Sequence, residues 1–446
     1  MRTSHLFMVC LFCSVALALQ ACDDSGGSSS NNDTQSDLKD QSGEDAPPEL
    51  SDLGVDSETA DTSLTEVTEV TDVTELEEVT VDPCGRPLAD ADAPRVVVAQ
   101  HPYLEAGVPG TSWDVLDLES DGTLTASGVS FEMGRAFWGS VEFARNGGVG
   151  IVVQDDGSLG VFRIELDGSI TVVYTGYTDG LYAGSVHVAA SGEYAYVLDP
   201  NWRNNGGGVF KVDIACDGTL TTTDLQIPSK LARGAVALDS PGHDRYFVAA
   251  VDILDSPATL TSAHIVDFAP TPAVLSSADG FGDEDASVSA VARTHDGRFA
   301  LVADNGMFSV PHRVSVLRID GDQLTPVQTL SPFTDPAAVV TSPYDNAALV
   351  VAGEDDALFG LRYDPAATDA PFTVLGELAY PTGDRPQLPF SAVMIDRGLL
   401  RGRVLIAENL AIRQVQFNPD GSITDLGTTS LGSGIPAIVG AIGVQP

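Results

Sequence analysis

One pattern recurs along most of this chain at intervals of about 45 to 55 residues, from Val141 to the C-terminus. Each unit reads as an apolar segment, a turn, a second apolar segment, a loop, an alternating segment, a tight turn and a final segment. The second segments are short, rich in β-branched residues and bounded by turn residues, as buried strands are. They are residues 150–153, 194–197, 246–249, 299–302, 348–351 and 404–407.

The third segment of the unit alternates apolar and polar residues, which is typical of a half-buried strand. Examples are residues 161–165, 209–213, 314–318 and 414–417. Asp-Gly follows each of them, at Asp167, Asp217, Asp320 and Asp420, and Asp-Gly is a strong hairpin signal. Each unit is therefore predicted to be a four-stranded antiparallel meander, and no unit contains a convincing helix.

The phase of the repeat predicts how the domain closes. Six complete units start near Val141, Val186, Val236, Val291, Val339 and Val393. A seventh starts at residues 436–439 and stops after one strand, while residues 95–100, 113–118 and 124–128 supply three more strands at the other end. A blade shared between both ends leaves no open sheet edge. We therefore predict an all-β, seven-bladed β-propeller over residues 84–446.

Two segments carry a resemblance to a known group of propellers. They are Thr-His-Asp-Gly-Arg-Phe-Ala-Leu-Val-Ala at 294–303 and Phe-Asn-Pro-Asp-Gly-Ser-Ile-Thr at 417–424. They resemble the repeats of the bacterial YVTN and lactonase-like seven-bladed propellers, although the Tyr-Val-Thr-Asn signature itself is absent. The resemblance spans about 350 residues at repeat level and supports the fold more than any activity. It implies a binding face formed by the loops that follow the second strands and by the loops that join the blades.

The N-terminus reads as a secretory signal. A basic residue at Arg2 precedes an apolar run that is too short to span a bilayer comfortably, and the run ends in Leu-Gln-Ala-Cys at residues 19–22. Those four residues resemble the lipobox of bacterial lipoproteins. We predict a signal peptide over residues 1–21, lipidation of Cys22, and attachment to the cell envelope at the outer membrane or cell surface rather than the inner membrane. An ordinary secretory signal is the alternative.

Residues 22–83 form a polar, acidic stretch without an aromatic residue, which has too little apolar surface to fold. We predict a disordered stalk. The whole chain has a formal net charge of −42, which disfavours nucleic acid and anionic membrane surfaces as partners. An envelope protein, a glycan or a cation fits this charge better. The propeller itself is expected to be a monomer whose contact with lipid is the acyl anchor.

Cysteine usage predicts one disulfide. Cys10 and Cys13 belong to the signal and Cys22 to the lipid attachment, which leaves Cys84 and Cys216 in an oxidising compartment. A bond between Cys84 and Cys216 is the simplest interpretation. The alternative is two unrelated thiols, because sequence alone does not give the distance between them.

Acidic residues follow the second strands in register. With one histidine at the matching point of the closing blade, they form a predicted ring on the loop face: Asp155, Asp199, Asp252, Asp304, Glu354, Glu408 and His101. Carboxylates around a pore could bind a hard cation such as Ca2+ or another ligand. They could equally be ordinary turn residues of an acidic chain, and no calcium-loop spacing is present.

Three arginines, Arg135, Arg233 and Arg385, each precede a first strand and are predicted to lie near the same mouth. They could clamp an anionic ligand or neutralise the acidic ring. The lactonase-like resemblance implies acidic, histidine and arginine side chains at this place. His187 is a further candidate by residue type, although a packed histidine is the more economical interpretation of its position in a first strand.

Two classes of function remain compatible with the sequence. One is a non-enzymatic envelope module that binds through its loop face, and the other is a lactonase-like hydrolase that uses the acidic mouth. The sequence has no Gly-x-Ser-x-Gly elbow, no His-Glu-x-x-His motif, no phosphate loop and no dinucleotide fingerprint. The binding module is therefore the prediction that the sequence favours.

Overall fold

The computed structural model divides the chain into two units, Met1–Glu75 and Leu76–Pro446. It describes residues 81–87, 90–100, 103–104, 111–136, 141–154, 156–176, 183–199, 208–228, 232–238, 244–251, 261–268, 273–279, 281, 288–305, 312–381, 383–431, 435–436 and 441–446. The predicted signal peptide, Cys22 and almost all of the stalk lie outside these residues. Within the described ranges, no helix has the length and apolar character needed to cross a membrane.

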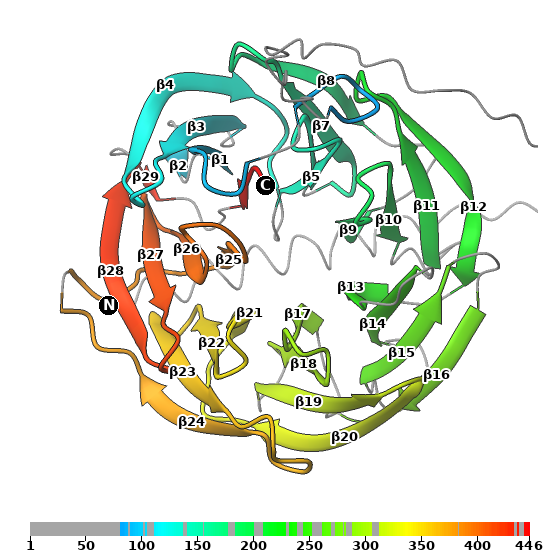
Figure 1. Ribbon diagram of the computed structural model, residues 1–446, viewed down its shortest axis with the longest axis vertical. Coiled ribbons are helices and arrows are strands. Elements are labelled where there is room, and N and C mark those ends of the chain that lie inside the picture. The colour runs from blue at the N-terminus through cyan, green and yellow to red at the C-terminus, as the bar shows by residue number, and fades with distance from the viewer. Residues whose placement is uncertain are drawn as a thin grey trace, which may run out of the picture. The chain divides into compact units, whose positions relative to one another are not determined.

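Leu76–Pro446 contains seven four-stranded antiparallel blades arranged in a ring (Figure 1). In each blade the first strand lies nearest the centre and the fourth forms the rim (Figure 1). Six blades are consecutive meanders, named blades 1 to 6 in chain order. Blade 1 is β5 (Glu142–Ala144), β6 (Val149–Val153), β7 (Leu159–Ile164) and β8 (Ile170–Gly176); blade 2 is β9 (Ser185–Val188), β10 (Tyr194–Asp199), β11 (Gly208–Ile214) and β12 (Leu220–Pro228); blade 3 is β13 (Ala232–Leu238), β14 (Arg245–Val251), β15 (Thr261–Asp267) and β16 (Ala273–Asp279). Blade 4 is β17 (Val288–Arg293), β18 (Phe299–Asp304), β19 (Arg313–Asp320) and β20 (Gln323–Leu330); blade 5 is β21 (Pro336–Thr341), β22 (Ala347–Ala352), β23 (Ala357–Tyr363) and β24 (Phe372–Glu377); blade 6 is β25 (Ser391–Met394), β26 (Arg403–Glu408), β27 (Ala411–Phe417) and β28 (Ile423–Ser430).

The closing blade joins both ends of the domain. It consists of β30 (Ile442–Val444), β1 (Arg95–Gln100), β3 (Ser112–Leu118) and β4 (Leu124–Glu132), in that order from the centre outward. β1 pairs with β3 on one side and with β30 on the other, where Val97 faces Val444 and Ala99 faces Ile442. The predicted seven-bladed propeller with a shared blade is confirmed.

The predicted position of the innermost closing strand was wrong. That strand is Ile442–Val444 and not residues 436–439. Ile435–Pro436 (β29) pairs instead with Tyr103–Leu104 (β2). Gly443 explains why the later residues close the ring, since a Cβ there would lie 2.5 Å from the Val141 Cβ. The strand that closes the ring must approach blade 1 closely, and a residue without a side chain permits that approach.

The hydrophobic core is divided among the interfaces between neighbouring blades. Seven clusters of buried side chains occur among the described residues, and each unites residues from two adjacent blades. The second strands supply much of this surface because both of their faces are covered; β18 and β22 are buried along their whole length. Their apolar runs are therefore explained by burial between two blades.

The predicted Asp-Gly turns join third and fourth strands. Gly122, Gly168, Gly218, Gly321 and Gly421 adopt positive φ, which costs glycine little. The carboxylates of Asp121, Asp167, Asp217 and Asp420 each accept a hydrogen bond from the backbone N–H two residues later. Hydrogen bonds from the residue two positions later lower the pKa of each of these four carboxyl groups. The local turn chemistry thus favours the same hairpin in several blades.

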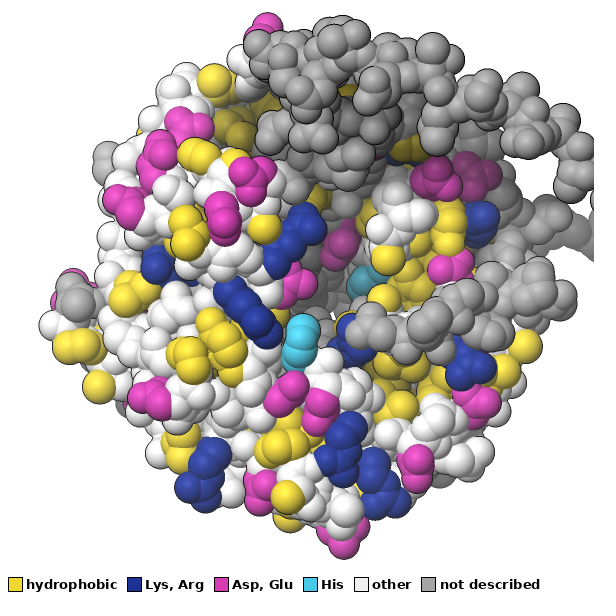
Figure 2. All heavy atoms as spheres, in the orientation of Figure 1, with side chains coloured by type: hydrophobic (Ala, Val, Ile, Leu, Met, Phe, Trp, Pro, Cys, Tyr) yellow, Lys and Arg dark blue, Asp and Glu magenta, His cyan; other side chains and the backbone are white. Residues whose placement is uncertain are grey.

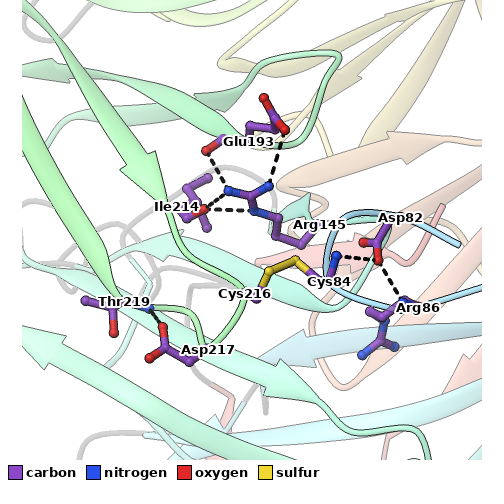
Figure 3. The surroundings of a disulfide bond; sticks show 9 residues. All are labelled: Asp82, Cys84, Arg86, Arg145, Glu193, Ile214, Cys216, Asp217 and Thr219. Carbon is purple, nitrogen blue, oxygen red and sulfur yellow. Dashed lines mark hydrogen bonds and ion pairs between the residues drawn. A yellow bond between two sulfur atoms is a disulfide. The ribbon is translucent and has the colours of Figure 1, made fainter.

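A disulfide joins Cys84 to Cys216, with a Cα separation of 5.4 Å (Figure 3). The predicted bond is therefore present. Cys216 lies in the turn between β11 and β12 of blade 2. Near it, the Arg145 guanidinium donates from Nε to the Ile214 carbonyl at 2.8 Å and forms an ion pair with Glu193 at 3.6 Å (Figure 3). These contacts fix the C-terminal end of β11, which leads into the turn that contains Cys216.

Cys84 belongs to a segment before β1 that we call the strap, defined as residues 81–87 and 90–94. Its first part is a tight turn in which Asp82 Oδ1 accepts the N–H groups of Cys84 and Arg86 at 2.9 and 2.7 Å (Figure 3). Arg86 then donates to the Ile164 carbonyl of blade 1 at 2.6 Å. At the other end, Asp92 accepts the N–H of Leu399, in the turn between β25 and β26 of blade 6, at 2.9 Å. The strap thus contacts blades 1, 2 and 6 before it enters the closing blade.

Candidate functional site

One face of the ring, called the loop face, carries the ends of the second strands and the connections between blades. The strap and the Asp-Gly turns belong to the opposite face, because the chain reverses there between first and second strands and between third and fourth strands. Figure 2 shows a hollow at the centre of the ring, seen from the side on which the strap crosses the blades, so the loop face is the far side of that view. On the loop face, the loop of blade 5 and the connections on both sides of that blade are described apart from Thr382, whereas residues 282–287 and 306–311 of blade 4 lie outside the described residues.

The structure places only part of the predicted acidic ring. Asp199, Asp304 and Glu408 are the last residues of β10, β18 and β26, and all three are buried. Glu354 departs from this register because it lies beyond the end of β22 and is exposed. Asp155, Asp252 and His101 lie outside the described residues. No group of three His, Cys, Asp or Glu side chains in the described part is placed to hold a metal ion, so a Ca2+ ring remains a prediction.

Glu408 belongs to a buried ionic cluster. Arg413, in β27, donates to Glu408 through Nε, to Asp425 Oδ1 at 2.8 Å and to the Asp384 carbonyl at 2.6 Å. The Arg413 guanidinium also lies over the Tyr380 ring, 5.3 Å from its centroid. Burial raises the pKa of Glu408, although the neighbouring Arg413 opposes that rise. The cluster fixes the loops of blade 6, and removing one member would leave a buried charge without its partner.

The three predicted mouth arginines do not form one described clamp. Arg385 is exposed and pairs with Glu377 at 2.8 Å. Arg135 lies beside the isolated bridge between Ala136 and Gln154 near blade 1. The side chain of Arg233 lies outside the described residues. Arg413 is also on this face and is fully buried. The prediction considered arginines that precede first strands, and it did not include Arg413 because this residue lies in a third strand.

Asp335 and His312 are neighbours between blades 4 and 5. The backbone N–H of Asp335 donates to Nδ1 of His312 at 2.5 Å, and Asp335 is 5% exposed. Nδ1 of His312 is therefore the acceptor in this contact, which leaves Nε2 as the ring nitrogen directed elsewhere. Asp335 has a φ of 51°, an uncommon conformation that often accompanies functional sites. We call Asp335 and His312 the carboxyl–imidazole pair.

The surroundings of Asp335 favour its protonated form. Burial raises the pKa of the Asp335 carboxyl, and the charges of Glu354 and Asp355 raise it further. A hydrogen bond with Asn305 and the proximity of His312 act in the opposite direction. Gly353 leaves room for the carboxyl, since a Cβ there would lie 2.8 Å from Asp335 Oδ2. A carboxyl in such a place is suited to proton transfer at a pH closer to neutrality than that of an ordinary aspartate.

Acidic side chains accept backbone hydrogen bonds that hold the loops around the carboxyl–imidazole pair. Asp355 Oδ2 accepts the N–H of Thr334 at 2.7 Å, next to Asp335 in the chain. Asp356 Oδ1 accepts the N–H of Leu388 at 2.7 Å, which joins blade 5 to the connection before blade 6. Asp304 faces Arg313 across β18 and β19. The pair thus rests on loops whose conformation several backbone contacts fix.

His187 has a structural environment, as the sequence favoured. It lies in β9, where its Nε2 accepts the N–H of Ala235 from the neighbouring blade at 3.3 Å. Ser185 Oγ lies 3.2 Å from the same nitrogen. Burial lowers the pKa of His187 to about 4, so the folded protein keeps this ring neutral at physiological pH.

We expect His187 to make folding stability depend on pH. Below about pH 6.5 the unfolded chain binds a proton at this position and the folded chain does not, so stability falls as the pH drops from about 6.5 to about 4. The contribution reaches up to about 3 kcal/mol and is smaller if solvent reaches the partly exposed side chain. Thermal unfolding of His187→Gln between pH 7 and 4.5 should show a shallower pH dependence than the unmodified chain. An equally shallow profile in the exposed variant His295→Gln would contradict the assignment.

Sequence reasoning missed Asp335, His312 and Arg413. Asp335 precedes Pro336 at the start of a first strand, a position equivalent to that of the predicted mouth arginines, so the inter-blade loops were the right place to search. His312 precedes the third strand of blade 4. Arg413 lies within a third strand, with acidic residues on both neighbouring strands at Glu408 and Asp425. An alignment of the strands within each predicted meander would place Arg413 between strands that carry Glu408 and Asp425.

Comparisons with known proteins support the fold. No protein-family model and no curated protein sequence matches this chain. Among solved structures, the periplasmic gluconolactonase of Pseudomonas aeruginosa matches with a TM-score of 0.54 and 15% identity, over 79% of this chain and 99% of the other. A Bacteroides uniformis protein assigned as a 6-phosphogluconolactonase matches with a TM-score of 0.54 and 15% identity, over 78% and 99%. A Bacteroides fragilis protein with the same assignment matches with a TM-score of 0.51 and 12% identity, over 80% and 99%. This chain therefore shares the seven-bladed propeller fold of the lactonase-like proteins.

Proposed function

We propose that this chain is a lactone-hydrolysing enzyme of the cell envelope, with its active site on the loop face at the carboxyl–imidazole pair. The observation that carries the proposal is the buried Asp335 next to His312, whose Nδ1 accepts the backbone N–H of Asp335. The lactonase-like proteins that share the fold support the reaction class. The non-enzymatic binding module, which the sequence favoured, lacks comparable support. Secretion and attachment through Cys22 are part of the same proposal, and the periplasmic neighbour is consistent with an envelope location.

The reaction requires a base and a group that polarises the lactone carbonyl. In the proposed mechanism the Asp335 carboxylate removes a proton from a water molecule while the water oxygen bonds to the carbonyl carbon. The Nε2–H of His312 donates to the carbonyl oxygen, which gains negative charge as the bond forms. The bond between the carbonyl carbon and the ring oxygen then breaks, and the proton held by Asp335 passes to that oxygen. The product is one hydroxy acid.

Turnover of glucono-1,5-lactone by the full chain tests the proposal, with acid release followed at pH 7 and the spontaneous rate subtracted. Asp335→Asn should lower kcat by about 100-fold or more, because an amide does not accept the proton from water. Asp369→Asn is a matched control, since this aspartate is exposed in the connection between β23 and β24 on the opposite face. Equal activity of Asp335→Asn and the unmodified chain would refute the role of Asp335.

His312 provides a second test because its role depends on a proton donor. In His312→Gln, the amide oxygen could accept the N–H of Asp335 while the amide nitrogen donates to the lactone. His312→Gln should therefore retain more activity than His312→Leu, which offers neither group. Equal losses in the two variants would point to imidazole as the base. No turnover of any lactone by the unmodified chain, together with binding of an envelope component, would favour the binding module.

The pH profile gives an independent measurement. Asp335 must be deprotonated to act as the base, and its surroundings raise its pKa. The acidic limb of kcat/KM should therefore have its midpoint above about 3.9, the ordinary value for aspartate. Any activity left in Asp335→Asn should lack this limb.

A further inference from the structure

We infer that this mouth accepts uncharged lactones and rejects phosphorylated ones. The inference rests on the proposed function and names the substrate class for the same site. Two of the solved relatives are assigned to a phosphorylated sugar lactone, whereas the third is a gluconolactonase. The fold alone therefore does not distinguish these substrates, and the charged groups beside the carboxyl–imidazole pair become decisive.

Proteins commonly bind a phosphate group through arginine or lysine, and the described arginines of blades 4, 5 and 6 on this face lie beside acidic residues, Arg313 opposite Asp304 among them. Arg413 is fully buried, and its donors are directed to Glu408, Asp425 and the Asp384 carbonyl. Arg385 forms its ion pair with Glu377. Binding a phosphate through Arg413 would break its buried contacts, and Arg385 would have to share its guanidinium between the phosphate and Glu377. These two cations therefore contribute little free positive potential for an anion.

Most of the charged groups near the carboxyl–imidazole pair are acidic. Glu354 is exposed beside it, and Asp355 and Asp356 follow in the same turn. Asp304 lies at the end of the neighbouring second strand, where it faces Arg313, the residue after His312. A phosphomonoester carries a charge of about −1.5 to −2 at pH 7, so these carboxylates would repel it.

The negative charges of these carboxylates also favour release of the product. An uncharged lactone enters without repulsion, whereas its hydrolysis product carries a new carboxylate. Repulsion between that carboxylate and Glu354 or Asp355 favours release of the product. An acidic mouth is therefore compatible with an uncharged substrate and an anionic product, while a phosphorylated substrate would be repelled on entry.

The test compares glucono-1,5-lactone with its 6-phosphate, using the full chain at low and at physiological ionic strength. We expect kcat/KM to be at least about 10-fold higher for the uncharged lactone at low salt, with a smaller ratio as salt screens the repulsion. Glu354→Lys should reduce the ratio several-fold by raising activity on the phosphorylated lactone. Asp369→Asn, on the opposite face, should leave the ratio unchanged.

The outcomes separate this inference from the proposed function. A higher kcat/KM for the phosphorylated lactone would overturn the inference and leave lactone hydrolysis standing. An unchanged ratio in Glu354→Lys would also overturn it, because the discrimination would then have another source. Absence of turnover with either lactone would overturn the proposed function and the inference together.

Discussion

Deletion of residues 435–446 is expected to open the ring and to make the domain aggregate. The deletion removes β30, the innermost strand of the closing blade, and leaves the inner edge of β1 without its partner. It also removes the fully buried side chain of Ile442 and the contact of Gln445 Nε2 with the Gly147 carbonyl at 2.9 Å. Lost burial and lost strand pairing together should lower the free energy of unfolding by about 5 kcal/mol. An exposed strand edge is in addition a template for association.

Thermal unfolding and light scattering of the full chain and the deletion variant provide the measurement. Gly443→Val is a useful companion, because it keeps the chain length but places a side chain against Val141. It should destabilise the domain in the same direction and by a smaller amount. Gln445→Ala should have a weak effect, since it removes a single side-chain contact. A deletion variant that stays monomeric and equally heat-stable would contradict the closure of the ring by β30.

The fold could be predicted because its determinants are local and repeated. Burial between two blades produces the short apolar second strands, and the Asp-Gly turns produce the hairpins within each unit. Because the same pattern occurs in six complete units, a strand that is unclear in one unit can be located by comparison with the others. The phase of the repeat therefore predicted the number of blades. The one wrong strand lies where the repeat is interrupted. The sequence of residues 436–439 is similar to that of residues 336–339 at the start of β21. The innermost strand of the closing blade is instead β30, whose Gly443 packs closely against blade 1.

The candidate site could be predicted only in part, because it depends on loop conformation. Asp304 and Glu408 are the last residues of their second strands, at the loop face. The contacts of the acidic residues there come from other strands and blades. Arg413 bonds to Glu408 from the next strand, and His312 of blade 4 accepts the backbone N–H of Asp335 at the start of blade 5. Asp335 also adopts a positive φ that a sequence pattern does not encode. Position along a repeat therefore predicts which face a residue occupies, but not which side chains meet there.

Loss of the disulfide between Cys84 and Cys216 is expected to produce the second large effect. The bond closes a loop with a sequence separation of 132 residues, so breaking it enlarges the conformational freedom of the unfolded chain. For a loop of this size the loss in unfolding free energy is about 5 kcal/mol. The strap should also detach more readily from blade 2, since Cys84 provides its covalent link to that blade.

The double variant Cys84→Ser/Cys216→Ser is the appropriate protein, because a single substitution would leave a reactive thiol. Its melting temperature should fall to that of the unmodified chain under reducing conditions, and reductant should have no further effect on it. Native-state hydrogen exchange in this variant should become faster at the backbone N–H groups of positions 84 and 86, which are bonded to Asp82 in the unmodified chain. Exchange in β22 and β23 should change least, because blade 5 makes none of the described strap contacts.

Arg86→Ala separates the covalent contribution of the strap from its hydrogen bonds. In the oxidised protein this substitution should cost little, because the disulfide keeps the segment beside blade 2 after the contact with the Ile164 carbonyl is lost. In the double cysteine variant the same substitution should cost more, since Arg86 and Asp92 then hold the strap without covalent help. Equal effects of Arg86→Ala in both backgrounds would mean that the disulfide stabilises the domain through the unfolded chain alone. A larger effect in the cysteine-free background would show that the bond and the hydrogen bonds hold the same segment to the ring.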